Sequence, residues 1–521
     1  MLATVLSATL FGLEGRLIRV EVDVAPGLPG FSIVGLPDAA LSEARERVRG
    51  AIRNSGFEYP ARRIAVNLAP ADVRKAGASL DLPIALAILL GSGQTRSRGV
   101  WALLGELSLS GQVRRVPGIL PLAACLARSG ARRIVVSADA VAEAALAPAA
   151  EPIGVTSLSE AVEIVAVGRP RRRSAVRAQV DLTGDAVSPA IGHDPYAHLD
   201  EHPDLAEVRG QREARRALEI ALAGGHAMLL VGPPGSGKTL LARTIPGLLP
   251  PLDDEAALTA TVIASVTDTG SLRGLIRRPP FRSPHHTISY AAMVGGGPRL
   301  TPGEVTRADG GVLFLDELPE FGRDVLEALR EPLEDGRVTI ARAGRAATFP
   351  ARFQLVAAMN PCPCGGSGLD GRGCSCKLGV PERYAARVSG PLRDRIDLWV
   401  GVPRVEPGEV VGTVEPEGSA AVASRIAAVR EVQRARNRGR LNGRLAGRAL
   451  RASCGLSATS LGTAAELARL ESYTARGTER LLRVARTIAD LVGVARVEPV
   501  HLIEAARFRD PAALMSRRIA C

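Results

Sequence analysis

Eight consecutive residues carry the clearest chemical potential in the chain: Gly232, Pro233, Pro234, Gly235, Ser236, Gly237, Lys238 and Thr239. Glycines let successive backbone N–H groups turn toward phosphate oxygens, and the N-terminus of a following helix adds its positive end. Lys238 can then reach the β- and γ-phosphates, and Thr239 can hold Mg²⁺. Because lysine occurs only three times among 66 basic residues, a chance match to this pattern would be rare. The stretch predicts a nucleotide-binding loop.

Carboxylate and amide side chains follow two apolar runs farther along the chain. Residues 311–315 lead into Asp316 and Glu317, and residues 353–359 lead into Asn360. Such runs are typical of buried parallel strands, whose carboxyl ends meet at one edge of a sheet. We therefore expect Asp316 to support the Mg²⁺ shell, Glu317 to act as general base on the attacking water, and Asn360 to orient that water.

Arginines precede a further apolar run in residues 389–398, S-G-P-L-R-D-R-I-D-L. An arginine in such a loop can stabilise the charge that develops on a γ-phosphate, as an arginine finger does. We expect Arg395 to take this role on a neighbouring copy of the chain. An arginine that acts in trans predicts a ring-forming homo-oligomer.

Four of the seven cysteines lie close together, at Cys362, Cys364, Cys374 and Cys376. Four thiolates suit a tetrahedral Zn²⁺ that would fasten a glycine-rich loop with little core of its own. Free reduced cysteines and a redox role are the alternatives. The odd number of cysteines, the lack of a signal-peptide pattern and the absence of a long apolar run favour a cytoplasmic protein without membrane contact.

The tandem pair His285-His286 could ligate a metal or join a network between subunits. No third ligand stands nearby in the sequence, and a zinc site takes at least three protein ligands. We therefore expect these histidines to have a structural role.

The net charge of +12 and the sequence pI near 10.0 favour a polyanionic partner, nucleic acid before membrane, although an arginine-rich composition alone would give the same charge.

Residues 336–350 are typical of a β-hairpin with Arg342 and Arg345 near its turn, and residues 291–310 form a Gly/Pro-rich insertion. Such arginines could follow DNA phosphates without reading sequence; ordinary solvated turns are the alternative. Residues 425–451 hold nine arginines, which fit either phosphate contacts or a solvated arm.

Length and patterning place these residues in an α/β protein of about three domains. Residues 1–167 alternate strand-like runs (17–24, 64–68) with a helical run (38–54), and residues 168–203 form a basic linker. Residues 204–402 form the nucleotide-binding core, a parallel sheet with flanking helices that contains the cysteine-rich loop 362–376. A helix over 205–223 precedes its first strand, 228–231. Residues 403–521 form a basic segment, with a helix break between 437 and 447, and then a small helical lid.

The first domain resembles the proteolytic domain of Lon-type proteases through K-A-G-A-S (75–79), L-L-G-E-L-S-L-S-G (103–111) and V-P-G-I-L (116–120). Ser79 occupies the place of the nucleophile of that family. The place of its activating lysine is taken by Leu120, and a leucine cannot activate a serine hydroxyl. We therefore expect a Lon-like domain without proteolytic activity.

Over nearly its whole length the chain resembles the ComM/YifB family of magnesium-chelatase-like AAA+ ATPases. The motifs that carry the resemblance are G-P-P-G-S-G-K-T, F-R-S-P-H-H-T-I-S, V-L-F-L-D-E-L-P-E-F, N-P-C-P-C-G, S-G-P-L-R-D-R-I-D and L-R-V-A-R-T-I-A-D-L. The resemblance implies Walker A residues at Lys238 and Thr239, Walker B at Asp316 and Glu317, sensor 1 at Asn360 and an arginine finger at Arg395. It also implies a sensor 2 arginine, for which Arg476 is our first choice and Arg480 and Arg483 are the alternatives.

The same resemblance implies ATP and Mg²⁺ as cofactors and a hexameric ring that moves branched DNA. The function expected from it is a branch-migration helicase that supports homologous recombination and natural transformation. The alternative is a chelatase-type ATPase that remodels a protein partner, since the magnesium-chelatase motor subunit shares this core. A third class, an ATP-dependent peptidase using Ser79, is not expected.

Overall fold

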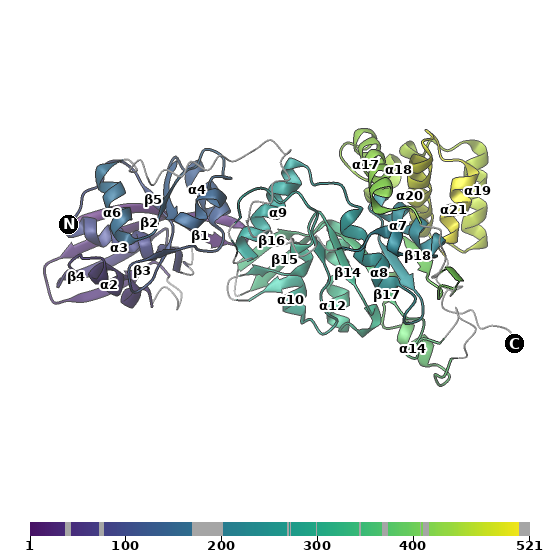
Figure 1. Cartoon of the computed structure of the whole chain (residues 1–521), viewed down its shortest axis with the longest axis horizontal. Coiled ribbons are helices and arrows are strands. Elements are labelled where there is room, and N and C mark those ends of the chain that lie inside the picture. The colour runs from purple at the N-terminus through teal and green to yellow at the C-terminus, as the bar shows by residue number, and fades with distance from the viewer. Residues whose placement is uncertain are drawn as a thin grey trace.

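The computed structural model describes most of the chain, and Figure 1 shows its parts in a row. The described residues are 1–36, 43–71, 75, 78–168, 202–267, 270, 272–297, 300–342, 345–366, 374–406, 408–409 and 416–509. The predicted basic linker, 168–203, lies outside the described residues except at its ends. A sheet with helices forms one end of the molecule, a second sheet lies in the middle, and helices form the other end.

The N-terminal part is built on a seven-stranded mixed sheet with the order β3-β4-β2-β1-β5-β8-β9. Its strands are β1 (Leu2–Phe11), β2 (Glu14–Ala25), β3 (Gly30–Val34), β4 (Arg63–Ala69), β5 (Ala102–Leu103), β8 (Arg133–Ser137) and β9 (Glu151–Val155), with the short pair β6 (Glu106–Leu107) and β7 (Val113–Arg114) beside it. Its helices are α2 (Ala44–Asn54), α3 (Asp81–Gly91), α4 (Ile119–Arg128), α5 (Val141–Ala144) and α6 (Leu158–Val167). Every residue of α3 is buried, because this helix packs against β1, β2 and α2. An α/β domain is therefore confirmed here.

The three residues that carried the Lon-like resemblance are all buried in this domain. Ser79 lies in the short helix η1 (Ala78–Leu80), and Leu120 lies in the first turn of α4. Lys75 donates a hydrogen bond from Nζ to the carbonyl oxygen of Pro70. A buried leucine thus stands where the activating lysine of Lon-type proteases would be. The expectation that this domain has no proteolytic activity stays a prediction.

The central part contains a five-stranded sheet in which all strands run parallel, with the order β11-β14-β17-β10-β18. The strands are β10 (Met228–Val231), β11 (Phe281–Arg282), β14 (Val312–Leu315), β17 (Gln354–Met359) and β18 (Leu398–Gly401). Residues along each strand alternate between two hydrophobic clusters: Met228 and Leu230 belong to one, and Leu229 and Val231 belong to the other. A sheet buried on both faces needs helices on both sides, so the predicted parallel α/β core is confirmed.

The helices of this core are mostly short. They are α7 (Arg212–Gly224), α8 (Lys238–Arg243), α9 (Asp254–Thr267), α10 (Tyr290–Val294), α11 (Glu304–Arg307), α12 (Arg323–Ala328), α13 (Arg330–Asp335), α14 (Val380–Ala385) and α15 (Gly390–Arg393). The prediction of one helix over 205–223 is wrong for residues 205–211, because α7 begins only at Arg212. A short turn, η4 (Leu205–Glu207), is separated from α7 because Gly210 and Gln211 adopt left-handed backbone angles of +61° and +51°.

In the described part of the C-terminal lid, residues 416–509, the helices are α17 (Ser419–Arg436), α18 (Gly447–Cys454), α19 (Ala458–Leu470), α20 (Ala475–Val492) and α21 (Pro499–Arg507). The predicted helix break between 437 and 447 is present, and it holds only the turn η7 (Asn442–Arg444). Helix α20 packs against α7 and α21, so that the lid and one face of the parallel sheet share a hydrophobic cluster.

The N-terminal part contacts the core through helix α9. The Ser265 hydroxyl of α9 donates to the buried carboxylate of Glu143 at 2.6 Å, and the Leu120 amide donates to the Ser265 hydroxyl oxygen at 3.3 Å. Glu143 is paired with Arg115 at 2.7 Å, and both side chains are almost completely buried. A buried ion pair therefore lies where the N-terminal part meets helix α9 of the central part.

Candidate nucleotide site

The loop from Gly232 to Gly237 joins strand β10 to helix α8 at the carboxyl edge of the parallel sheet. Gly235 and Gly237 have φ angles of +77° and +91°, and a Cβ on either would face open space as far as the described residues extend. Gly232 is needed for a different reason, because a Cβ there would lie 2.1 Å from the Val402 carbonyl oxygen. The loop thus keeps its inner face clear of side chains, as a phosphate cradle requires.

Lys238 and Asn360 lie together beneath this loop. Lys238 Nζ donates to the carbonyl oxygens of Gly232 and Pro233 at 2.7 and 2.8 Å, and to Asn360 Oδ1 at 3.2 Å. The contact follows from the strand order, because β17, which directly precedes Asn360, pairs with β10. Two polar groups expected to face the γ-phosphate are therefore adjacent in space.

Thr239 and Asp316 meet as the sequence predicted. The Thr239 hydroxyl donates to Asp316 Oδ2 at 2.7 Å, and the Glu317 amide donates to Asp316 Oδ1 at 2.9 Å. A hydroxyl beside a carboxylate is a suitable oxygen set for Mg²⁺, which takes hard oxygen ligands and keeps several of its waters. The geometry therefore fits the predicted magnesium ion.

His286 contacts Glu317, a contact that the sequence analysis missed. His286 Nδ1 lies 3.2 Å from Glu317 Oε2, and the His286 ring stands edge-on to Phe321. The segment with His286 follows strand β11, which pairs in parallel with β14, so both chains leave the sheet at the same edge. The pairing of β11 with β14 is a long-range feature, and sequence spacing alone did not suggest it.

Gln211 is a second side chain that the sequence analysis did not single out. Its amide donates to the Ser236 carbonyl oxygen at 3.1 Å and to the Pro403 carbonyl oxygen. It thereby ties the phosphate loop to the segment that follows β18.

The candidate finger and sensor arginines surround a different site, a cavity of about 330 Å³. The basic side chains that line it are Arg395, Arg444, Arg476, Arg480 and Arg483. Arg480 pairs with Asp394 at 3.3 Å, and Arg395 pairs with Glu334.

The residues that line this cavity show where it lies relative to the phosphate loop. The cavity is also lined by Ala227, which directly precedes β10, and by Gln354, the first residue of β17. It therefore opens at the amino ends of the parallel strands, whereas Lys238, Asp316 and Asn360 follow their carboxyl ends. Because β10 has four residues, the two edges are about 13 Å apart.

The predicted β-hairpin at residues 336–350 is present as β15 (Arg337–Arg342) and β16 (Arg345–Pro350), paired from Arg337↔Pro350 to Arg342↔Arg345. Residues 343–344 between the strands lie outside the described chain. Arg342 is exposed at the tip, and Arg345 is half-buried. At its base, Ala347 and Phe349 pack against Gly12, in the turn between β1 and β2. The insertion at 291–310 contains a second, shorter pair, β12 (Gly295–Gly296) with β13 (Thr301–Pro302).

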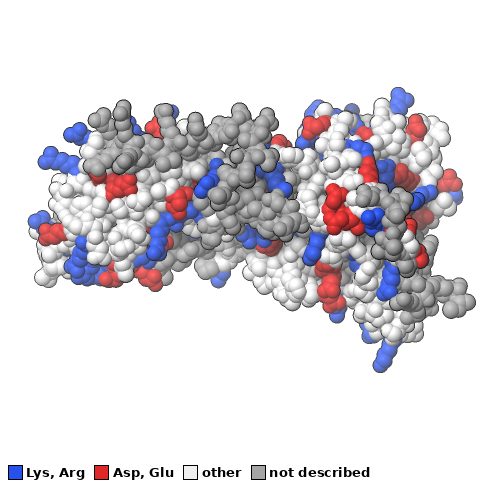
Figure 2. Space-filling model, in the orientation of Figure 1, with Lys and Arg blue, Asp and Glu red and all other residues white. Residues whose placement is uncertain are grey.

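The arginine-rich segment 425–451 is not a free basic arm. Arg430 is buried and donates to the Leu222 carbonyl oxygen, Arg436 forms an ion pair with Asp490, and Arg425 bridges Glu219 and Glu417. These arginines stabilise the lid, so they are not available to bind phosphate. Arg438, Arg440, Arg448 and Arg451 are also exposed. Among the described residues on the face shown in Figure 2, basic and acidic side chains are interspersed and form no continuous basic patch.

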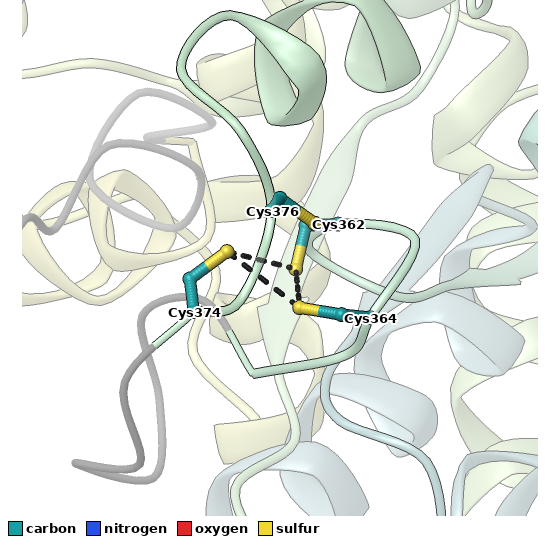
Figure 3. Close-up of side chains that lie close together, drawn as sticks. All are labelled: Cys362, Cys364, Cys374 and Cys376. Atoms are coloured by element: carbon teal, nitrogen blue, oxygen red, sulfur yellow. Dashed lines mark hydrogen bonds between the residues drawn. The ribbon is translucent and has the colours of Figure 1, made fainter.

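The four cysteines predicted to bind zinc converge beyond the end of β17, as Figure 3 shows. The Sγ atoms of Cys362, Cys364 and Cys374 lie 3.3, 3.7 and 3.6 Å apart, and all four Sγ atoms, Cys376 included, lie within 4.8 Å of one another. The Gly366 amide donates to Cys364 Sγ, and this bond lowers the pKa of the Cys364 thiol to about 5. The arrangement can hold a metal ion.

Three family models match the chain. "Subunit ChlI of Mg-chelatase" matches residues 20–140, "Magnesium chelatase, subunit ChlI" matches residues 204–410, and "Magnesium chelatase, subunit ChlI C-terminal" matches residues 416–509. The middle match spans both the phosphate loop and the cysteine cluster.

Among the described residues, no helix combines the length and the apolar character needed to cross a bilayer.

Relatives match the chain from end to end. The chain is 43% identical to a protein of Escherichia coli named "Uncharacterized protein YifB" over 98% of this chain and 97% of that protein. It is 39% identical to "Competence protein ComM" of Haemophilus influenzae over 99% of both chains. A shorter match, 29% over 182 residues, links it to "DNA replication licensing factor MCM3 homolog 1" of Zea mays. The resemblance is thus confirmed, and the chain belongs to the ComM/YifB family of magnesium-chelatase-like AAA+ ATPases.

Proposed function

We propose that this ATPase is a ring-forming DNA motor, a branch-migration helicase that supports homologous recombination and natural transformation. The observation that carries the proposal is the division of the hydrolytic residues between two opposite edges of one sheet. A chain divided in this way needs a second copy to complete its site. The similarity to ComM, named a competence protein, and the shorter match to the MCM3 homologue, named a DNA replication licensing factor, support DNA as the substrate.

In the proposed hydrolysis, the glycine loop and Lys238 bind the phosphates. Thr239 and Asp316 would hold Mg²⁺, which supplies charge neutralisation between the β- and γ-phosphates. Glu317 would take the proton of the attacking water, with its carboxylate oriented by His286 at 3.2 Å. Asn360, bonded to Lys238, would align that water with the γ-phosphate.

Arg395 would act on the neighbour's nucleotide. Its own phosphate loop follows the opposite ends of the strands, which supports a role on the neighbour's nucleotide and not on that of its own chain. Arg476 lies beside Arg395 on the same cavity, and we therefore propose that sensor 2 also acts in trans. An arginine placed this way raises turnover by stabilising transition-state charge.

DNA would pass through the centre of a hexamer and touch the hairpin β15–β16 at Arg342 and Arg345. The base of this hairpin contacts both the core and the β1–β2 turn, so a nucleotide-driven movement of the core would reach its tip. Arginines at a tip bind phosphates irrespective of sequence, which suits a motor.

A Zn²⁺ ion in the cysteine cluster is part of the same proposal. Zinc bound tetrahedrally by thiolates at about 2.3 Å requires sulfur atoms about 3.8 Å apart. The Sγ–Sγ distances among Cys362, Cys364 and Cys374, 3.3 to 3.7 Å, are close to this value.

The second candidate function is a chelatase-type ATPase that remodels a protein partner, which the magnesium-chelatase family models favour. Both candidates use the same nucleotide site, so ATP hydrolysis alone does not separate them. They differ in the molecule that stimulates turnover.

The test is ATP turnover with and without forked DNA at several salt concentrations. We expect stimulation that falls with salt, because phosphate contacts release counterions. Lys238→Ala should abolish turnover with or without DNA. Arg342→Ala combined with Arg345→Ala should lose the stimulation but keep basal turnover, whereas Arg469→Ala, an exposed arginine of the lid, should behave as wild type. Turnover that is indifferent to DNA would favour the protein remodeller.

A further inference from the structure

The cysteine cluster lies against the nucleotide site. Cys362 is fully buried and follows Asn360 by two residues, at the end of strand β17. Gly365 sits in the turn after Cys364, and a Cβ added to it would lie 2.3 Å from Pro234 Cδ. The turn that carries two of the four thiols therefore rests directly on the phosphate loop.

The chain that leaves the cluster returns to the other side of the same site. Helix α14 follows Cys376 and buries Tyr384 in the hydrophobic cluster that also contains Val231 and Leu315. Arg387, just past this helix, donates to the Pro319 carbonyl oxygen at 3.2 Å and to Glu320 at 2.9 Å. Pro319 follows Glu317 by two residues. The segments on either side of the cluster thus contact both the phosphate loop and the turn after Glu317.

We propose that a metal ion bound by Cys362, Cys364, Cys374 and Cys376 braces the nucleotide site, so that its presence sets ATP affinity and turnover. The inference rests on the proposed zinc site and on the ATPase activity. A metal that only fastened the cysteine-rich loop would leave ATP affinity and turnover unchanged, whereas the metal proposed here affects both. Without the ion, the cluster loses the bonds from four thiolates to one cation, and the turn at Gly365 is held less firmly against Pro234. Asn360, which is tied to the same turn through Cys362, would then lose its alignment with Lys238.

The metal is a soft divalent cation, for which Zn²⁺ is the probe. Four sulfur ligands exclude the hard cations that the Thr239–Asp316 pair would take, since Mg²⁺ prefers oxygen. The two proposed metal sites therefore differ in the ion they prefer, Zn²⁺ at the four sulfurs and Mg²⁺ at the oxygens of Thr239 and Asp316. A zinc-dependent change in turnover can be separated from a magnesium-dependent one by titrating Zn²⁺ at a fixed saturating Mg²⁺ concentration, and Mg²⁺ at a fixed zinc content.

The experiment compares the full-length protein before and after zinc is removed with a chelator under reducing conditions. We expect about one zinc per chain in the untreated protein, and a roughly tenfold loss of affinity for a fluorescent ATP analogue after removal, reversed by added Zn²⁺. Cys362→Ser combined with Cys364→Ser should show the same loss without rescue. Cys125→Ser, a buried cysteine of the N-terminal part, should behave as wild type. Far-ultraviolet circular dichroism checks that each protein stays folded.

Pro234→Ala provides a second variant that keeps all four cysteines. It removes the contact with Gly365, so we expect full zinc content but a smaller change in ATP affinity when zinc is removed. Three results would overturn the inference: a wild-type protein without stoichiometric metal, a zinc-free protein with unchanged ATP affinity and turnover, or an equal response in Pro234→Ala and wild type. The second result would leave the ATPase and motor proposal intact, whereas a protein that hydrolyses no ATP even with zinc would contradict that proposal instead.

Discussion

Mixing two inactive variants should restore ATP turnover if the site is shared between copies of the chain. Lys238→Ala removes the ammonium that binds phosphate at the carboxyl edge of the sheet. Arg395→Ala removes the arginine at the amino edge, about 13 Å away along β10. Each variant alone should be inactive, because every interface in a uniform ring lacks one of the two groups.

The expected size of the recovery follows from this division. In an equal mixture, an interface is intact only when the subunit that binds ATP carries Arg395→Ala and its neighbour carries Lys238→Ala. Random assembly gives this arrangement at about one interface in four, so turnover should return to about a quarter of the wild-type value if sites act independently. If Arg395 served the nucleotide of its own chain, no mixture would contain an intact site.

The assay is steady-state ATP hydrolysis across mixing ratios, with a maximum expected at equal amounts. Differently tagged variants must co-purify, which shows that mixed assemblies form. Gel filtration of Arg395→Ala must match wild type, because Arg395 also pairs with Glu334 and could affect folding. Mixed assemblies with no turnover at any ratio would refute the trans geometry.

Three further outcomes follow from contacts in the structure. His286→Phe keeps the packing on Phe321 but removes the nitrogen beside Glu317, so kcat should fall about tenfold with KM nearly unchanged in steady-state assays. Ser265→Ala removes a charge-assisted hydrogen bond to Glu143 between the first domain and α9, and should lower the unfolding free energy by about 2 kcal/mol in denaturant titrations; an unchanged midpoint would contradict the contact. Burial raises the pKa of Asp81 to about 6, so the folded state holds the carboxyl proton more tightly than the unfolded chain does. The stability that this proton contributes is therefore present below about pH 4 and is lost as the pH rises to about 6. Asp81→Asn should therefore show a smaller fall in melting temperature over that range.

Much of the nucleotide site was predictable because its chemistry is local. Gly235, Gly237, Lys238 and Thr239 act through backbone angles and side chains that consecutive residues fix. Asp316 and Asn360 were found because a buried strand that ends in a polar residue can be recognised without knowing its neighbours. The contact between Thr239 and Asp316 then follows from any parallel sheet that contains both strands.

The arginine-rich segment shows the limit of reading charge from sequence. Nine arginines between 425 and 451 were expected to bind phosphate or to lie in solvent, yet Arg430 and Arg436 are held by lid and core groups. Their partners, the Leu222 carbonyl oxygen and Asp490, are 208 and 54 residues away in sequence. Composition records how much charge a segment carries but not which distant groups neutralise it.

The sequence by itself determined the identity of the phosphate loop, the acids that follow β14 and the thiols that can hold a metal. Only the tertiary structure decided that Arg395 and Arg476 share a cavity across the sheet from Lys238, that His286 contacts Glu317, and that Gly365 rests on Pro234. The physical reason is that side-chain chemistry and backbone angles are properties of neighbouring residues. The edge of a sheet at which a residue ends up depends on strand order, which is set by packing between segments far apart in the chain.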